Sequence, residues 1–443
     1  MKYIYISLLS LILASCDSFL DIQPTGKVIA KTSDEYRALL TGVYKNFPDD
    51  RSLTTLRTDE MTLSPSLTSS EDINSYFDIW TWNDVASDEN TASFNWRVFY
   101  HTIYIANYVI EHETEITDGT AAEISQMVGE AYMLRAYCHF ILVNLFGEPY
   151  TKCNITESLA IPFSLKADVE EVLSRNTVAD IYSQILTDID AADEHLNVKT
   201  WETGYSYRFN TISAEALRSR VLLYMGDWEG ALTAAEKVIK EHPDLEDLTD
   251  KNYTMPENCN SKEAIMSLEQ VMKSAYKGIG SPNVDFISQY RTGDMRKTRF
   301  FKTQTSRIYT LQKGGSTDCR STFRSAEAYL NAAEAAARLG KKDDVIAYLT
   351  PIIKTRYLSA IQSAVIDELR DKDNDELVNS VLKERCLELC FEGHRWFDLR
   401  RTTQPSITKT YDDIQYTLQE GDSRYTMPIP TEAISANPNL TTE

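Results

Sequence analysis

Basic residues are in short supply in this sequence. Its 443 residues include 45 Lys and Arg against 66 Asp and Glu, which gives a formal net charge of −21. Proteins that bind nucleic acid gain much of their affinity from cations that neutralise phosphates. The charge therefore argues against nucleic acid as a partner, although it carries no information about the fold.

Recognisable catalytic motifs are absent as well. None of the six histidines belongs to an HExxH pair, and the sequence contains neither a GxSxG elbow nor a glycine-rich phosphate loop. Two carboxylates for glycoside hydrolysis need no fixed spacing in a sequence, so that chemistry stays open, but no pair stands out. The sequence therefore predicts a protein that is not an enzyme.

Cysteine is sparse for a chain of this length. Beyond Cys16, single cysteines stand at positions 138, 153, 259, 319, 386 and 390, and a chain of this size needs no disulfide framework. Cys386 and Cys390 share a helix face, but no histidine or second cysteine pair stands nearby at a zinc-site spacing. We expect buried thiols, with no metal and no cofactor.

Apolar runs long enough to span a bilayer are also missing. The run from Ile4 to Leu13 follows Lys2 and precedes small residues, which is the pattern of a secretory signal peptide at 1–15. Leu13-Ala-Ser-Cys16 resembles a bacterial lipobox, in which the cysteine carries the lipid anchor; the alternative is a buried cysteine beside an ordinary cleavage site. Loss of residues 1–15 changes the formal charge from −21 to −22.

The sequence does contain strong helical periodicity. Thr32-Ser-Asp-Glu35 forms a capping box, and apolar residues follow at three- and four-residue spacings as far as Pro48. A second apolar face begins at Trp96, and Thr177-Val-Ala-Asp180 opens a further helix. From Ala131 to Phe146 nearly every residue is apolar, which predicts a helix that is buried all round. We expect one continuous helical array rather than several domains.

Two later helix pairs carry an internal repeat. Small or apolar residues lie at the same offsets after two glycines, namely Ala231, Ala235 and Val238 after Gly226, and Val345, Leu349 and Ile352 after Gly340. A glycine at the interhelix turn and small residues on the second helix resemble a tetratricopeptide repeat, whose pairs stack to bury a face. The predicted fold is mainly all-α, with tetratricopeptide-like helix pairs in a single domain over 16–443.

The segment from Glu384 to Arg401, ERCLELCFEGHRWFDLRR, is the most distinctive part of the chain. Its apolar residues at helical spacing predict an amphipathic helix that runs up to Gly393, with the glycine as its C-cap. Beyond Gly393, Trp396 and Phe397 stand among alternating charges. This composition favours a semi-buried, salt-bridged strap over a helical core.

The pattern ER-x-x-EL-x-FEGHRWFDL-x-R resembles the C-terminal signature of the SusD/RagB family, the nutrient-binding outer-membrane lipoproteins of Bacteroidetes. Four further segments agree with that family in their order along the chain. They are the start Cys16-Asp-Ser-Phe-Leu-Asp-Ile-Gln-Pro, the helix with Trp96, Tyr100, Ile103 and Asn107, the run from Phe323 to Gly340, and the ending from Met427 to Leu440. The resemblance implies a SusD-like domain that is anchored in the outer membrane through Cys16, faces the cell surface and partners a SusC-like TonB-dependent transporter.

Two stretches without helical periodicity, at about 49–93 and 244–322, are expected to form the binding site. Both mix aromatic rings with hydroxyl, amide and guanidinium groups, which suits sugars because their C–H faces lie on rings while their hydroxyls take directional hydrogen bonds. The candidate ligand-binding residues are Tyr76, Trp80, Trp82, Tyr276, Tyr290 and Arg291. The alternation from Tyr76 to Trp82 equally fits a short strand with both tryptophans in the core.

Three functions are compatible with the sequence. The preferred one is a surface lipoprotein that binds an oligosaccharide and delivers it to a SusC-like transporter as its lid. The second is a member of the same family that binds peptides, and the third is a secreted glycosidase. The absence of a catalytic signature argues against the third.

Overall fold

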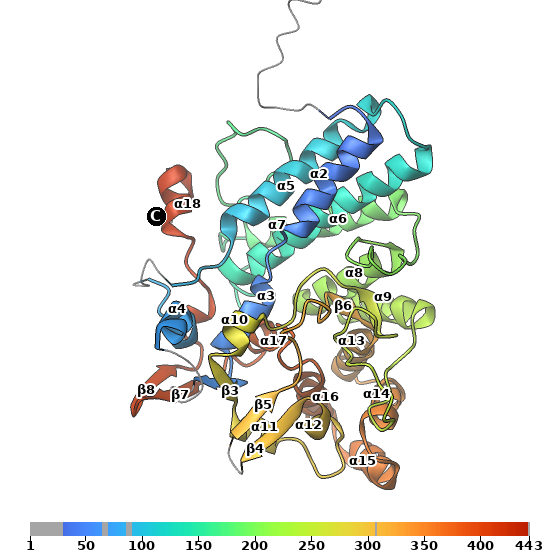
Figure 1. The fold of residues 1–443 in the computed structure, drawn as a ribbon, viewed down its shortest axis with the longest axis vertical. Coiled ribbons are helices and arrows are strands. Elements are labelled where there is room, and N and C mark those ends of the chain that lie inside the picture. Colours follow the sequence, from blue (N-terminus) through green and yellow to red (C-terminus); the bar gives the residue numbers. More distant parts are fainter. Residues whose placement is uncertain (1–29, 64–69, 86–90, 306–307, 442–443) are drawn as a thin grey trace, which may run out of the picture.

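The computed structural model describes residues 30–63, 70–85, 91–305 and 308–441, so the predicted signal peptide and Cys16 lie outside the described residues. Figure 1 shows long helices at the top and along one side, with short helices and strands gathered on the other side. Among the described residues, no helix has both the length and the apolar composition needed to cross a membrane.

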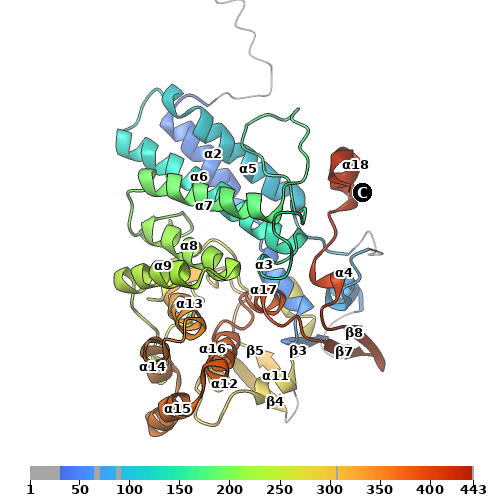
Figure 2. The ribbon, with the colours of Figure 1, turned by 180° about the vertical axis from the view of Figure 1, so that it is seen from behind.

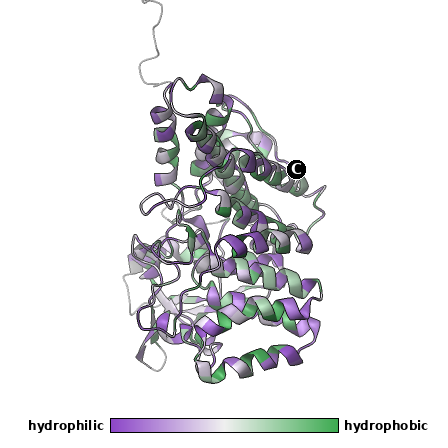
Figure 3. Ribbon diagram, turned by 90° about the vertical axis from the view of Figure 1, so that its right-hand side faces the viewer, coloured by the Kyte–Doolittle hydropathy of each residue, from purple (hydrophilic) through white to green (hydrophobic). Residues whose placement is uncertain are grey.

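The scaffold is a series of helices that pack on their neighbours. They are α2 (Ser33–Lys45), α5 (Trp96–Glu111), α6 (Ala121–Phe146), α7 (Val178–His195), α8 (Thr211–Met225), α9 (Trp228–Glu241), α13 (Ser325–Arg338), α14 (Lys342–Arg356), α15 (Ser359–Asp371) and α16 (Asn374–Glu388). The mainly α-helical fold is thus confirmed. Figure 3 shows hydrophobic and hydrophilic positions alternating along the stacked helices, as expected for helices that bury one face.

Several local predictions for these helices are confirmed. The capping boxes at Thr32 and Thr177 begin α2 and α7. Helix α6 lies between α5 and α7, and from Gln126 to Phe146 every residue except Tyr132 is buried. This helix is therefore the centre of the upper part of the core.

The repeat identified in the sequence forms two packed helix hairpins, α8 with α9 and α13 with α14. Gly226 and Gly340 follow the first helix of each pair with positive φ angles of 78° and 72°, which glycine adopts without strain. The residues at the matching offsets are all buried: Ala231, Ala235, Val238, Val345, Leu349 and Ile352. Helix α13 also packs on α9, so the two hairpins stack although about 80 residues separate them in sequence.

The remaining elements are short. The helices are α3 (Asp50–Leu53), α4 (Ser70–Thr81), α10 (Ser274–Lys277), α11 (Val284–Ser288), α12 (Arg296–Arg299), α17 (Arg395–Arg401) and α18 (Thr431–Ala436), with 3-10 turns η1 (Thr54–Arg57), η2 (Glu113–Glu115), η3 (Ser423–Tyr425) and η4 (Pro438–Leu440). The strands are β1 (Met61–Leu63), β2 (Ala264–Met266), β3 (Gly280–Pro282), β4 (Phe301–Thr305), β5 (Ile308–Leu311), β6 (Phe323–Arg324), β7 (Ile407–Tyr411) and β8 (Ile414–Leu418).

These strands form antiparallel pairs, β1 with β3, β2 with β6, β4 with β5 and β7 with β8. In the first pair Thr62 lies opposite Ser281. The two stretches that lack helical periodicity in the sequence therefore meet through β1 and β3.

The signature segment differs from its predicted form. Helix α16 ends at Glu388 rather than at Gly393, and the expected strap is a second helix, α17, after a tight turn. Gly393 lies in that turn with φ of 75°, and a Cβ there would approach the carbonyl of Arg51 to 2.4 Å. Only glycine fits this close approach to the backbone of Arg51 at a positive φ.

A network of buried charges surrounds Glu388. Its Oε2 accepts hydrogen bonds from Arg296 Nη1 at 3.2 Å and Arg356 Nε at 2.9 Å, and its Oε1 accepts from Arg324 Nη1 at 2.9 Å. Glu263 and Glu392 accept further bonds from Arg324. Burial alone would raise the pKa of Glu388, but the charges of Arg356 and Arg324 outweigh burial and hold that pKa well below its usual range.

We predict that Glu388→Gln destabilises the protein strongly. The substitution keeps the side-chain volume but leaves three buried guanidinium groups short of negative charge, which costs about 3–5 kcal/mol of unfolding free energy. Urea denaturation measures the change. The matched control is Glu368→Gln, because Glu368 pairs with Arg291 on the surface, where such pairs contribute about 0–1 kcal/mol. Equal effects of both substitutions would contradict a structural role for the network.

A second buried carboxylate, Glu60, holds the turn after α16. Its Oε1 accepts the N–H of Phe391 at 2.8 Å, and Phe391 has a positive φ of 61°. The single hydroxyl proton of Thr58 lies within reach of both Thr55 O at 2.8 Å and Glu60 Oε2 at 3.0 Å. Burial raises the pKa of Glu60 to about 7.

This pKa predicts how stability depends on pH. The folded value lies above the unfolded value of 4.5, so the contribution of Glu60 is complete below about pH 4.5 and is lost as the pH rises through about 7. Glu60→Gln mimics the protonated side chain. At pH 8 this variant should exceed the native protein in unfolding free energy by on the order of 2 kcal/mol, and at pH 5 the two should nearly agree. Urea midpoints at both pH values test this, and an unchanged difference would exclude titration of Glu60 in this range.

Candidate functional site

A cavity of about 1060 Å³ opens beside α4 and the β7–β8 hairpin. Its lining comes from the end of α4 and the turn after it, the end of α6 and the loop that follows, Arg175 before α7, and the C-terminal segment from Gln404 to Leu440. Figures 1 and 2 show α4, β7, β8 and α18 along the same side of the molecule. The cavity thus joins parts of the chain that are far apart in sequence.

Two half-buried rings form one wall. Phe77 from α4 and Tyr416 from β8 meet edge to face, with ring centres 5.4 Å apart and an interplanar angle of 89°. The buried ring of Trp80 supports both from behind, with centres 6.1 Å from each. The wall therefore offers partly exposed aromatic faces on a rigid base.

Buried contacts hold the turn after α4 in place. Trp82 has a positive φ of 59°, which is unfavourable for a bulky residue, and its Nε1 donates to Arg57 O at 2.9 Å. The buried ammonium of Lys409 lies 4.1 Å from the Trp82 ring centre and donates to Trp80 O at 3.0 Å. Burial holds the pKa of Lys409 well below its usual value, and the charge of Arg57 acts in the same direction. These contacts direct Asn83 and Asp84 toward the cavity.

Arg57 ties that turn to the C-terminal segment. Its fully buried guanidinium binds Asp84 through two hydrogen bonds of 2.6 and 2.9 Å and also donates to Arg424 O at 2.8 Å. The same group stacks 4.7 Å from the ring centre of Trp396 in α17. The Arg57 side chain thus connects the turn after α4 to the C-terminal segment, and both of these line the cavity.

Arg400 from α17 likewise connects two parts of the lining, the loop after α6 and the C-terminal segment. Its Nη2 donates to Gly147 O at 2.6 Å, just after α6, and to Thr426 Oγ1 at 3.2 Å. Its remaining donors bind the carbonyl oxygens of Tyr425 and Asn144. Because these partners are uncharged, burial lowers the pKa of Arg400 to about 10. The signature segment therefore builds the frame of the cavity.

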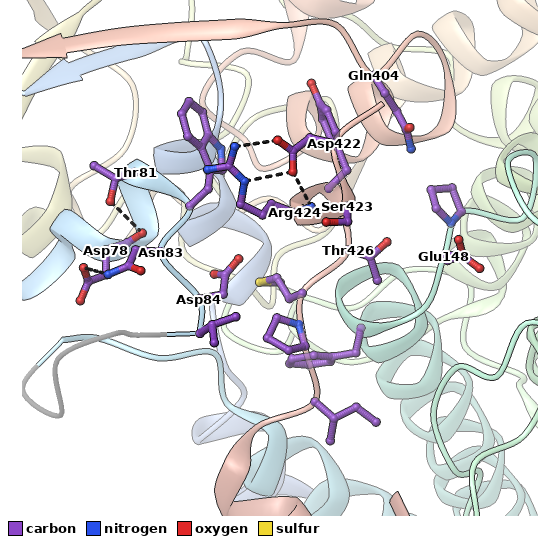
Figure 4. A pocket seen from close by; sticks show the side chains of 18 of the residues that line it. Asp78, Thr81, Asn83, Asp84, Glu148, Gln404, Asp422, Ser423, Arg424 and Thr426 are labelled. Carbon is purple, nitrogen blue, oxygen red and sulfur yellow. Dashed lines mark hydrogen bonds and ion pairs between the residues drawn. The ribbon is translucent and has the colours of Figure 1, made fainter. Parts of the chain in front are cut away.

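An ion pair stands within the lining. Asp422 accepts from Arg424 Nε at 3.0 Å and from Arg424 Nη2 at 2.6 Å, and Figure 4 shows both side chains at the centre of the cavity. The hydrogen bonds from Arg424 hold the pKa of Asp422 below its usual range. Figure 4 also labels the other polar side chains of the lining, Asp78, Thr81, Asn83, Asp84, Glu148, Gln404, Ser423 and Thr426. The cavity thus combines rings with both donors and acceptors.

Most of the ring positions expected from the sequence lie in the core. Trp80, Tyr276 and Tyr290 are 0%, 3% and 2% exposed, so a ligand has no access to them in this structure. The Tyr290 hydroxyl donates to Leu387 O at 2.8 Å, and Trp80 Nε1 donates to Met61 O at 3.2 Å. We therefore correct these three positions to core packing. The short strand that the alternation from Tyr76 to Trp82 also fitted is wrong, because these residues form the end of α4 and the turn after it, although both tryptophans are buried.

The other three candidates lie in different places. Trp82 lines the cavity but is 1% exposed, so its ring forms part of the buried base of the cavity. Tyr76 is half-buried and packs edge to face on Tyr276, outside the lining. Arg291 is exposed and binds Glu368 on α15. The stretch 244–322 supplies no lining residue among those described, whereas the stretch 49–93 supplies the end of α4.

Sequence reasoning missed the C-terminal wall. Tyr416, Asp422 and Arg424 follow the last long helix in a hairpin and a turn with Gly421, a non-helical segment like the two that were considered. The lack of helical periodicity in this segment is the sequence feature that could have indicated these residues. A cluster of three or more side chains suited to holding a metal ion does not occur in the described parts of the chain.

The fold and the cavity define a class of protein built from stacked tetratricopeptide-like helix pairs, with a ring-lined cavity between its helices and its C-terminal segment. Two family models match the chain. The one described as "Starch-binding associating with outer membrane" matches residues 18–223, and the SusD family model matches residues 233–443. The chain belongs to the SusD family, as its signature segment predicts.

Individual relatives agree with this assignment. A SusD-like protein from Formosa agariphila is 24% identical, with 90% of this chain and 91% of that protein covered. A SusD superfamily protein from Bacteroides fragilis shares the fold with a TM-score of 0.76 at 22% identity, covering 94% of this chain and 100% of that one. A SusD-like carbohydrate binding protein from Bacteroides vulgatus has a TM-score of 0.66 at 18% identity, covering 93% and 98%.

Proposed function

We propose that this protein is a surface lipoprotein that binds an oligosaccharide in the cavity beside Phe77 and Tyr416 and delivers it to a SusC-like transporter as its lid. The observation that carries the proposal is the cavity itself, where two partly exposed rings stand among carboxylate, amide, hydroxyl and guanidinium groups. Sugars need this combination, because each ring presents both an apolar C–H face and a belt of hydroxyls. Binding and release involve no covalent step, so the protein is proposed to have no catalytic activity.

Family membership supports a carbohydrate ligand. One matching family model is described as starch-binding, and one relative of the same fold is a carbohydrate binding protein. A peptide ligand is the alternative within the family, and hydrolysis of a glycan is the alternative outside it. Both are outcomes of the binding experiment below.

We predict that Tyr416→Ala weakens oligosaccharide binding at least tenfold, since the loss of a stacking ring at a binding hot spot costs about 2 kcal/mol or more. Tyr416→Phe keeps the ring and should retain binding within about threefold. Glycan arrays and calorimetry with the soluble chain from Asp17 onward measure both, with melting temperatures as a folding check. Tyr205→Ala is the matched control, because Tyr205 is an exposed tyrosine outside the cavity lining.

The same experiment separates the alternatives. Equal binding by Tyr416→Ala and the native protein would place the ligand elsewhere. Binding to a peptide pool and to no glycan would favour a peptide-binding member of the family. Release of shorter products from a labelled glycan would reveal a glycosidase.

Attachment to the outer membrane is proposed to come from a lipid on Cys16, on the strength of the lipobox-like Leu13-Ala-Ser-Cys16 and the outer-membrane description of the family model. An anchored lid cannot itself move a ligand across a bilayer, so delivery requires a transporter. Ligand contacts with both proteins would favour the closed state, because only differential contacts shift such an equilibrium.

We predict that the tagged protein, purified from gently solubilised outer membranes, brings with it a large β-barrel transporter in near-equal amount. A complex that survives extraction needs a contact area above about 1,000 Å². Cys16→Ala should move the lipoprotein to the soluble fraction, and deletion of the barrel should abolish ligand uptake while the soluble chain still binds. Recovery of the lipoprotein alone, with normal uptake in the deletion strain, would exclude the lid mechanism.

A further inference from the structure

The charges that line the cavity nearly balance one another. Four carboxylates and three cations belong to the lining, namely Asp78, Asp84, Glu148, Asp422, Lys152, Arg175 and Arg424. Most of them are already engaged within the protein. Arg57, just behind the wall, neutralises Asp84 through two hydrogen bonds, and Arg175 donates to the carbonyl oxygens of Leu159 and Ala160. Glu148 and Lys152 are both exposed and carry opposite charges, so they add no net charge.

Arg424 is the cation at the centre of the cavity, and its donors are largely occupied. Nε and Nη2 bind Asp422, and Nη2 also donates to Thr417 O at 2.8 Å. Only Nη1 is without a protein partner among the described residues. An anion that reached Nη1 would bind to a single nitrogen rather than to the fork of two nitrogens that gives arginine its preference for carboxylate and sulfate-like groups.

Asp422 keeps its negative charge beside that free nitrogen. Its carboxylate accepts from four N–H donors, which are Gln419 N at 3.2 Å and the N, Nε and Nη2 of Arg424. An approaching sulfate or carboxylate would therefore lie close to a fixed like charge, which opposes binding. A sugar hydroxyl meets no such penalty, because it donates to a carboxylate and accepts from a guanidinium.

We infer that the Asp422–Arg424 pair makes the cavity selective for uncharged oligosaccharides over sulfated or uronic-acid oligosaccharides of the same length. This inference rests on the proposed function, since it names the class of sugar that the same cavity takes. In this role Asp422 repels an anionic oligosaccharide and also occupies the donors of Arg424 that an anion would need.

The test uses Asp422→Asn, which removes the charge while the amide oxygen still caps η3. The probes are neutral hexose oligosaccharides and their sulfated and uronic-acid counterparts of equal length, measured on an array and by calorimetry. The native protein should bind the neutral members at least tenfold more tightly. Asp422→Asn should raise affinity for the anionic members at least tenfold, because Arg424 then lacks its counter-charge. Asp422→Ser, which also keeps a capping oxygen, should act in the same direction.

Asp367→Asn is the matched control. It removes one carboxylate from an exposed aspartate–arginine pair on α15, changes the net charge by the same amount and should leave both affinities unchanged. Equal or tighter binding of anionic glycans by the native protein would overturn the inference while the proposed function stands, and so would folded Asp422 variants without the gain. Failure of the folded native protein to bind any glycan would overturn the proposed function, and the inference with it.

Discussion

The fold depends on the pairing of charges that the protein buries around Glu388. The three guanidinium groups that contact this carboxylate come from α12, from β6 directly before α13 and from the end of α14. Since a buried charge that loses its partner is strongly destabilising, none of these elements can shift without cost to the others. The network therefore locks a helix hairpin of the repeat, the signature helix α16 and the long irregular stretch 244–322 into one arrangement.

The buried arginines at the cavity also hold backbone: Arg57 binds one carbonyl oxygen besides Asp84, and Arg400 binds three carbonyl oxygens. Arg57 donates to the carbonyl oxygen of Arg424, and Arg400 donates to carbonyl oxygens at the end of α6, just after it and in the C-terminal segment. A guanidinium bound to carbonyl oxygens fixes the path of a loop whatever side chains that loop carries. Such a frame can stay constant while the residues that face the ligand change.

This division explains what could be predicted from the sequence. The starts of α2 and α7, the buried helix α6 and the glycine turns of the repeat depend on residues close together in sequence, so capping and periodicity indicate them correctly. The end of α16 is not indicated correctly, because the turn after it packs against the distant residue Arg51. Whether an aromatic ring in an irregular segment faces a ligand or the core depends instead on distant partners. The buried Tyr290 hydroxyl donates to the carbonyl oxygen of Leu387, and Arg57 donates to the carbonyl oxygen of Arg424, 367 positions away. Composition alone contains neither contact.

The most recognisable motif of the chain carries little information about the ligand. Trp396 and Arg400 of the signature segment support the cavity from behind, whereas Phe77, Tyr416 and the Asp422–Arg424 pair face it. Family membership therefore predicts the frame, and the ligand has to be inferred from side chains in segments without a motif. In those segments the decisive property is which charges are already paired within the protein, because a paired cation has few free donors for an anionic sugar.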